Sequence, residues 1–438
     1  MNSVPDFNTT MRIAATATMA ADPVDLVTQV CRRLDELREA HHQDLGRAAS
    51  LSSQVVDLGR RCGDRGLLAD ALAAAAHVYA SRDEVYRCYP FALEAQHLFE
   101  AQGRLAQAGR MLNFRGICFD VLGDAERALE LYAEALTMLK EASDESYIPR
   151  VLNNIGVVDL RQGYHTSAIA CLTEAVQRGE ALPHSSAHWV HLCTLAEARA
   201  EYGIALQERA EVAEATRQID DALTLLAKIG SASFEIESIG VRAACLNVAS
   251  RLHLLLGNLE RGREYTMRLW SVTKQCGSPN YVAVAYARFA ELRCMQQRIP
   301  KACRWRQRAE RTFERLQMKN ELREMLERLS TVAGRSGDAK YALQFFKRAL
   351  ELRKETHTAG AALRSQLLAF DREAAQQRRH MQEALIHAGK MALVGGLVTE
   401  LNADLKGPLG DAGVCVTRML EACGRRDSAQ LERWLVDL

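Results

Sequence analysis

The sequence has little proline, glycine and aromatic content, and these shortages narrow the fold class. Its 438 residues include only 8 prolines and 27 glycines, too few for a collagen-like or linker-like chain. Aromatic residues make up 6%, and β-branched runs are scarce, which argues against a sheet-rich fold. Hydrophobic residues at 48% and charged residues at 25% are ordinary globular values and exclude wholesale disorder. Leu, Ala, Glu, Arg and Gln abound, and these residues favour helices.

The chain also lacks a surplus of charge and any long apolar run. Its 56 basic and 55 acidic residues give a net charge of +1, so charge provides no argument for a nucleic-acid partner. No apolar run approaches the roughly 20 residues of a membrane helix. Residues 11–21 resemble a signal peptide only faintly, because their apolar core is short. We therefore expect a disordered extension over residues 1–22, no membrane partner and a cytoplasmic location.

The twelve cysteines are scattered singly, and none has the C-x-x-C spacing of a zinc or dithiol site. Most stand among apolar neighbours, as reduced buried thiols do in a cytosolic protein. The sequence also contains no convincing Ser/His/Asp or Cys/His catalytic set. We expect no metal, no cofactor and no enzymatic activity.

A small residue recurs at a nearly fixed period through most of the chain. The spacings are 40, 40, 47, 47, 40 and 40 residues, and the positions are Ala95, Ala135, Ala175, Ala222, Leu269, Ala309 and Ala349. In four of these units a glycine stands twelve residues earlier: Gly123, Gly163, Gly257 and Gly337. A helix, a glycine stop, a polar start and a second helix form a tight helical hairpin. The period therefore predicts about seven stacked hairpins.

Within each unit, small residues stand where the two helices of a hairpin must approach closely. The clearest unit places Gly156 on its first helix and Ala168 and Leu172 on its second. The preceding unit repeats the pattern with Gly116 and Tyr132. We expect these positions to lie in the core between the paired helices.

This pattern resembles the tetratricopeptide repeat over about residues 65–352, in units longer than the usual 34 residues. The resemblance implies an all-α superhelical solenoid with a concave groove. We place the array at residues 65–355 and two capping helices at residues 23–64. Pro300 fits the first turn of a helix, whereas Pro90 is predicted to kink or delay one. The same frame places Ala342, Phe346 and Ala349 on the apolar face of the last hairpin.

In tetratricopeptide arrays the first helix of each hairpin lines the groove, and two such helices here repeat a polar pair. The pairs are Arg110 with Asn113 and Arg150 with Asn153, and Asn247 stands at the matching place two hairpins later. Asn can pair with a peptide amide, and Arg can clamp a carboxylate. One interpretation is a site for an extended peptide or an acidic segment. The alternative is a solvated face whose arginines pair within the chain.

The last part of the chain carries a different signal. Residues 356–388 have the spacing of a coiled-coil-like linker helix, which predicts a parallel homodimer. Residues 389–438 follow with KMALVGGL at 390–397 and ADLKGPL at 403–409. These motifs resemble, in order, the dimerisation and phosphoacceptor helix of sensor histidine kinases.

The departures from that family concern its chemistry. The family's phosphoaccepting histidine is replaced by Ala403, which has no lone pair to attack a phosphate. Asp404 keeps the acid that follows it, and Gly407 stands where the family often has Thr or Asn. No Gly-rich ATP-binding motif follows. We expect this segment to be truncated, degenerate and catalytically inactive.

Together these patterns predict a signal-transduction protein. It would bind a protein or peptide in its groove and relay that state to the inactive kinase-like segment, which would contact a response regulator or a partner kinase. One alternative is the sensor region of a two-component kinase whose ATP-binding domain is missing. The other is a plain tetratricopeptide scaffold.

Overall fold

The computed structural model describes residues 23–376, apart from 44, 83, 183–185, 233–235, 237, 277, 317, 336 and 356–359, together with a few single residues beyond 376. The chain divides into two compact units, residues 1–367 and 368–438. The described residues form helices and no strand, as predicted. No helix in this part of the chain is long and apolar enough to cross a membrane.

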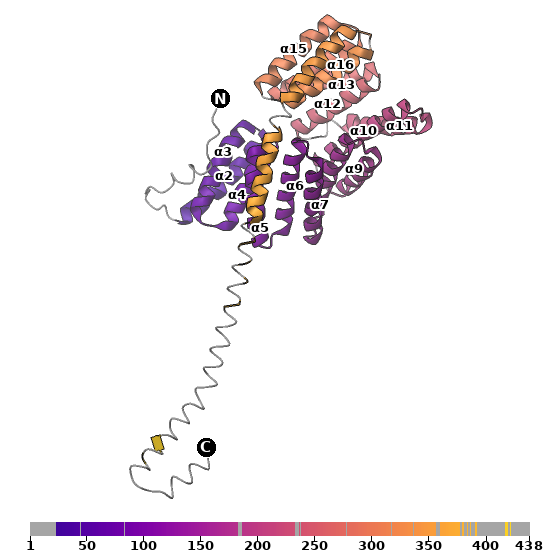
Figure 1. Cartoon of the computed structure of the whole chain (residues 1–438). Coiled ribbons are helices and arrows are strands. Elements are labelled where there is room, and N and C mark those ends of the chain that lie inside the picture. The colour runs from indigo at the N-terminus through magenta and orange to yellow at the C-terminus, as the bar shows by residue number, and fades with distance from the viewer. Residues whose placement is uncertain are drawn as a thin grey trace. The chain divides into compact units, whose positions relative to one another are not determined.

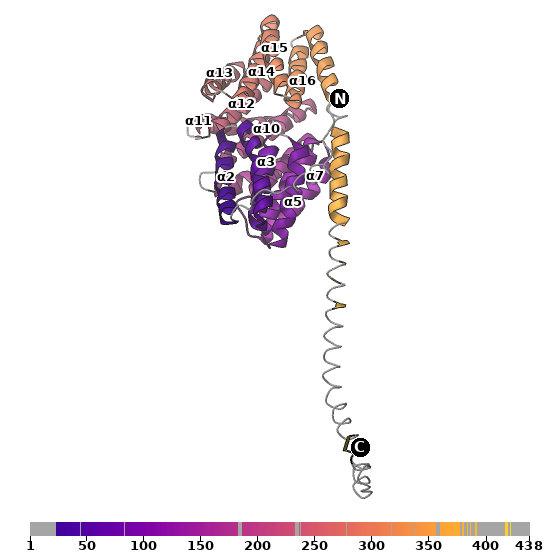
Figure 2. The same ribbon diagram turned by 90° about the vertical axis from the view of Figure 1, so that its left-hand side faces the viewer.

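The first unit is an array of helices that pack in consecutive pairs (Figures 1 and 2). Two further helices, over residues 339–355 and from residue 360 to 376, follow the fifteen labelled ones. The labelled helices are α2 (Pro23–Gln43), α3 (Leu45–Cys62), α4 (Arg65–Ala80), α5 (Val85–Ala101), α6 (Leu105–Val121), α7 (Ala125–Glu141), α8 (Ile148–Arg161), α9 (His165–Glu180), α10 (Ser186–Glu208), α11 (Val212–Ala232), α12 (Ile239–Leu255), α13 (Leu259–Cys276), α14 (Pro279–Met295), α15 (Ile299–Arg315) and α16 (Lys319–Arg335).

The even-numbered helices are the first helices of the hairpins and form one layer. Each contacts the first helix of the next hairpin, from α2 with α4 to α14 with α16. The odd-numbered second helices pack against their own first helix and the next one. The described second helices make no extensive contact with one another. The array therefore has an inner layer of first helices and an outer layer of second helices, as in a tetratricopeptide-type solenoid.

The small residues that define the period lie in the core of each hairpin. All seven, from Ala95 to Ala349, are no more than 1% exposed. Each lies on a second helix, and six of the seven are alanine, whereas Leu269 fills this position in the α12–α13 hairpin. The prediction of a hairpin array is confirmed.

In the six hairpins from α6–α7 onward, the turn between the two helices uses the left-handed backbone region. Gly123 and Gly163 have φ of +76° and +79°, and a Cβ on either would contact nothing, so only the backbone conformation calls for glycine there. In two hairpins without this glycine, the residues in the same frame are Ala210 and Gln297, with φ of +61° and +55°. Each adopts the same turn at a cost of about 1–2 kcal/mol.

Two helices of a hairpin approach most closely where the first helix has no side chain. A Cβ on Gly116 would lie 2.5 Å from the buried Tyr132 ring, and a Cβ on Gly156 would lie 2.6 Å from Leu172. Tyr132 and Leu172 are three residues before the small position of their hairpins. Glycine on the first helix therefore accommodates a large side chain on the second, as the sequence pattern predicts.

The same contact recurs with other residue pairs. Gly203 on α10 accommodates Ile219, whose Cγ1 would lie 2.7 Å from an added Cβ. In the α12–α13 hairpin the corresponding residues are Ser250 and Thr266, whose buried hydroxyls hydrogen-bond at 2.7 Å. Small residues on both sides, joined by a hydrogen bond, give the same close approach.

Two expectations from the sequence differ from the structure. Pro90 does not delay its helix, because it lies inside α5, which continues past it and begins in the same frame as α7. The carbonyl that its N–H would have bonded belongs to Tyr86, which lies in the exposed first turn, where water can replace that bond. Phe346 is 53% exposed, and Phe345 is buried in its place. The residue opposite Phe346 in the frame is Ser330, not glycine, so it leaves no gap for the ring.

The close approach at Gly116 predicts an unusual response to alanine. Gly116→Ala should lower the free energy of unfolding by about 1–3 kcal/mol, because the methyl group collides with the rigid Tyr132 ring. This loss should exceed the gain of about 1 kcal/mol in helix propensity. Gly334→Ala on α16 is the control, since its Cβ would meet no atom nearer than 3.9 Å. Urea unfolding should show opposite signs for the two variants, and two stabilised variants would contradict the packing described.

Candidate functional site

The polar residues predicted to line the groove gather in part around one tyrosine. Tyr147 stands directly before α8, and the amide of Asn113 donates to its hydroxyl at 3.3 Å. The guanidinium carbons of Arg110 and Arg150 lie 5.1 Å and 5.3 Å from the centre of its ring. Such cation–π contacts stabilise both arginines. The structure thus brings together residues from α6 and α8 that the sequence places 40 residues apart.

Within this cluster, Arg110 and Asn113 are already engaged. Arg110 forms an ion pair with Asp144 at 2.6 Å. Burial opposes ionisation of Asp144, but hydrogen bonds from Ser146 and Arg110 outweigh it and lower the pKa of that carboxyl. The Asn113 amide is fully buried, and its oxygen accepts from Asn154 at 2.9 Å. Both residues therefore hold the cluster together.

The other three predicted residues keep unused polar groups. Arg150 is exposed and forms no ion pair with a described residue. The side-chain oxygens of Asn153 and Asn247 are buried without a hydrogen-bond partner among the described residues. Buried amides without partners are uncommon, because each forfeits its hydration. On these first helices, Asn153 and Asn247 therefore offer hydrogen-bond acceptors, and Arg150 offers a cation with N–H donors.

His191 on α10 extends this polar surface toward the second half of the array. Its ring is buried, and its Nδ1 has no hydrogen-bond partner within the described chain. Burial, together with the nearby charge of Arg150, lowers the pKa of His191 to about 4. The imidazole is therefore neutral at physiological pH.

A charged stripe follows on the first helices α10, α12, α14 and α16, and the sequence analysis missed it. Its members carry charges of both signs and lie on these first helices: Glu197, Glu201, Arg251, Arg288, Glu291, Glu324 and Arg328. The repeat frame contained a pattern from which this stripe could have been predicted. Glu201, Arg288 and Arg328 each stand 21 residues before the small residue of their hairpin. Charges at one frame position in three hairpins indicate one shared surface.

Ion pairs connect the stripe across neighbouring hairpins. Arg251 pairs with Glu197 on α10. Glu291 on α14 receives Arg288 at 2.7 Å from its own helix and Arg328 at 2.9 Å from α16. Both carboxylate oxygens of Glu291 are thus used.

Arg288 lies deepest in the stripe. Its side chain is 2% exposed, and its Nη1 forms the ion pair with Glu291, while its Nε has no hydrogen-bond partner among the described residues. Burial lowers the pKa of Arg288 to about 9. A buried guanidinium with unsatisfied donors costs free energy unless a partner completes it.

Glu201 is the member of the stripe that forms no ion pair with a described residue. Its carboxylate forms no ion pair or hydrogen bond with another described residue, while the stripe contains four carboxyl groups and three guanidiniums. Burial, with the nearby charge of Glu197, raises the pKa of Glu201 to about 7. The carboxyl is therefore partly protonated near neutral pH.

The residues singled out in the kinase-like segment, Ala403, Asp404 and Gly407, lie outside the described residues. Among the residues that are described, no group of three or more His, Cys, Asp or Glu side chains is placed to hold a metal ion. The described cysteines are all free thiols.

Comparisons with known proteins identify the fold. No protein-family model and no curated protein match the chain. The Rap conjugation gene regulator of the plasmid pLS20, solved in complex with the Phr* peptide, is 11% identical and has a TM-score of 0.50. The match covers 78% of this chain and 98% of that one.

Two further structures resemble the chain less closely. A Rap protein complexed with Competence and Sporulation Factor is 13% identical, with a TM-score of 0.48 and coverage of 75% of this chain and 98% of that one. Kinesin light chain TPR-like repeats from Podosopora anserina are 13% identical, with a TM-score of 0.37 and coverage of 49% and 100%. At these identities the likeness concerns the fold of helical repeats.

The unpaired carboxyl of Glu201 predicts a specific pH dependence of stability. Between the unfolded pKa of 4.5 and the folded pKa of about 7, the folded chain keeps a proton that the unfolded chain has released. Stability contributed by this group is therefore lost as the pH rises through that window. Glu201→Gln should remove the loss and stabilise the protein at pH 8 by about 1–3 kcal/mol, an estimate reduced for partial exposure.

Urea unfolding at pH 5 and pH 8 measures this effect. Glu208→Gln, at an exposed position on the same helix, is the control and should follow the unmodified protein at both values. Parallel pH profiles for Glu201→Gln and the unmodified protein would show that Glu201 titrates normally.

Proposed function

We propose that this protein is a helical-repeat adaptor that binds an extended protein or peptide segment on the inner layer of first helices. The observation that carries the proposal is a set of buried polar atoms without partners among the described residues of the first helices: Oδ1 of Asn153, Nδ1 of His191, Oδ1 of Asn247 and Nε of Arg288. An extended backbone presents one N–H and one C=O per residue, which can satisfy such atoms in succession. The pLS20 regulator, with a similar fold, was solved with a peptide bound, which supports the same use here.

The chemistry of the ligand follows from the charges of these residues. Arg150 is the exposed cation of the Tyr147 cluster without an ion pair, so an acidic group of the segment would pair with it. The oxygens of Asn153 and Asn247 would accept backbone N–H groups. The occupant would therefore be an extended segment that carries at least one carboxylate.

A test starts from peptides selected against the full chain in a random display library. For peptides so selected, Arg150→Ala should raise the Kd about tenfold, since a charge-assisted hydrogen bond contributes roughly 1.5–3 kcal/mol. Asn247→Ala should also weaken binding, because it removes the side-chain oxygen that would accept a backbone N–H of the peptide. Arg217→Ala on the outer helix α11, where Arg217 pairs with Glu214, is the matched control. Peptides that bind all variants equally would place the binding site elsewhere.

We further propose that the array passes its bound state to the C-terminal helices. The start of the linker helix provides a physical connection, because Arg364 lies 3.8 Å from Asp124 at the α6–α7 turn and Leu367 is buried. The motifs at 390–397 and 403–409 support a kinase-like dimerisation segment. With Ala403 in place of the acceptor histidine, this segment would engage a response regulator or a partner kinase without transferring phosphate.

The relay requires that the C-terminal helices bring two chains together. Light scattering on the full chain should give the mass of a dimer, and removal of residues 356–438 should give a monomer that still binds the selected peptides. Equal masses for the two proteins would refute dimerisation through this segment. The peptide-binding result is independent of that outcome.

A further inference from the structure

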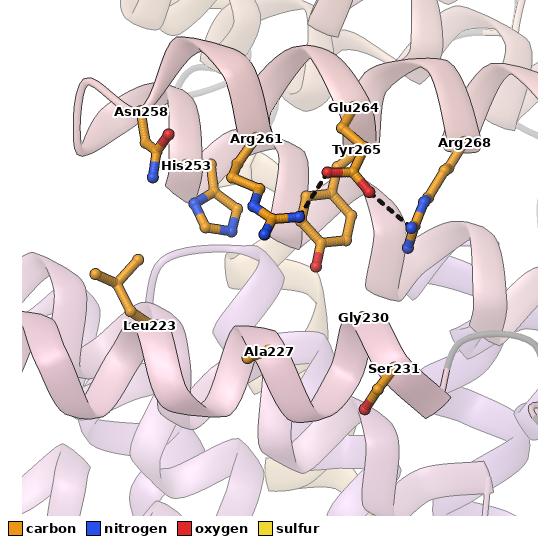
Figure 3. Close-up of a pocket in the computed structure, with 10 residues that line it drawn as sticks. All are labelled: Leu223, Ala227, Gly230, Ser231, His253, Asn258, Arg261, Glu264, Tyr265 and Arg268. Atoms are coloured by element: carbon orange, nitrogen blue, oxygen red, sulfur yellow. Dashed lines mark hydrogen bonds and ion pairs between the residues drawn. The ribbon is translucent and has the colours of Figure 1, made fainter.

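A pocket of about 490 Å³ lies in the outer layer between α11 and α13, away from the residues assigned to segment binding (Figure 3). It exists because these two second helices make no extensive contact in the described structure. At Gly230 the hydroxyl of Tyr265 comes so close to α11 that any Cβ would collide with it. Glycine at position 230 therefore allows Tyr265 to close one side of the pocket.

The rim of the pocket holds two guanidinium groups in fixed positions. Glu264 binds Arg261 at 2.8 Å through one carboxylate oxygen and Arg268 at 2.6 Å through the other (Figure 3). Each guanidinium has five N–H donors, and Arg261, which is paired with Glu264 through Nη1, keeps donors beyond this contact. The three side chains together carry one net positive charge, which favours an anion.

A buried histidine adds a polar group to the wall. His253 is 6% exposed, and its ring stacks on Tyr265 with centres 5.2 Å apart. Its Nδ1 has no hydrogen-bond partner among the described residues. Burial, together with the charge of Arg261, lowers the pKa of His253, so the ring contributes polarity without charge at neutral pH.

The opposite wall is apolar. Leu223 and Ala227 on α11 face Tyr265 and Arg261 across the pocket (Figure 3). This combination of an apolar wall, an aromatic side and a cationic rim is typical of sites that bury a small hydrophobic body and fix one charged group. The volume lies within the range of small-molecule pockets.

We propose that this pocket binds an organic carboxylate with a small apolar body. The carboxylate accepts hydrogen bonds from Arg261 beside the positive charge of Arg268, and the apolar body lies between the Tyr265 ring and the α11 surface at Ala227. Such a group is found on a free carboxylic acid and on the C-terminal residue of a peptide. The two sources share this chemistry and differ in what extends beyond the pocket.

The test uses 3-phenylpropionate as the probe and 3-phenylpropionamide as its neutral counterpart, titrated against the full chain by ligand-observed NMR. The acid should bind saturably in the millimolar range, and the amide at least tenfold more weakly. Arg261→Gln should weaken the acid at least tenfold. Lys228→Gln removes the same charge from α11 at an exposed pair with Glu180 outside the pocket, and should change the Kd less than twofold.

Filling the pocket gives a second, independent variant. Ala227→Phe keeps every charge and places a ring where the apolar body would lie, so it should abolish binding of the acid. Circular dichroism checks that the Ala227→Phe variant is folded. If it is not folded, the test relies on Arg261→Gln. Equal binding of acid and amide, insensitivity to both variants, or no saturable binding to the unmodified chain would overturn the proposal.

The source of the carboxylate is read from two peptides that end in phenylalanine, one with a free C-terminus and one amidated. Tighter binding of the free-acid peptide than of phenylpropionate, with loss on amidation, assigns the site to a peptide C-terminus. If the free-acid peptide binds more weakly than 3-phenylpropionate, the site is assigned to a free carboxylic acid. These results do not depend on peptide capture by the inner layer, because Arg150→Ala leaves the pocket intact.

Discussion

The architecture depends on how closely the two helices of each hairpin approach. Gly116 accommodates the Tyr132 ring, Gly156 accommodates Leu172, and in the α12–α13 hairpin two small hydroxyl residues give the same approach. Because this contact fixes each hairpin as a unit, the remaining apolar surface must be buried by the next hairpin. The first helices then become one continuous layer and the second helices another. Every site described here occupies one of these two layers.

The inner layer is polar in a way that stability alone does not explain. Ion pairs buried as deeply as Arg288 with Glu291 contribute little to stability, because desolvation offsets their attraction. The Nε donor of Arg288 and the side-chain oxygen of Asn247 have no hydrogen-bond partner within the described chain. Apolar residues of similar size would pack there at lower cost. A surface kept in this state is suited to exchanging its internal contacts for those of a bound segment.

The sequence predicted the parts of this protein that repeat, because local rules determine them. Buried Ala135 and Ala175 and the turn at Gly123 follow from helix geometry and a fixed period. The partners of polar side chains did not follow, because Asp144 meets Arg110 from a turn between hairpins. The charged stripe was missed for the same reason, since Glu291 and Arg328 are 37 residues apart. Phe346 was expected in the core and is exposed, and the opposite frame position of its hairpin holds Ser330 where other hairpins have glycine.

Asp124 has two tasks at the α6–α7 turn. Its side chain accepts the Arg127 N–H and so caps α7, and it also lies 3.8 Å from Arg364 on the helix that leaves the array. If ligand binding and the Asp124–Arg364 contact affect each other, each changes the equilibrium constant of the other by the same factor. If a ligand on α6 and α8 alters the hold on Arg364, then anything that restrains the departing helix alters the grip on the ligand by the same factor. Under that condition, the affinity measured for the same binding surface would differ between the protein with free C-terminal helices and the protein with these helices tethered or removed.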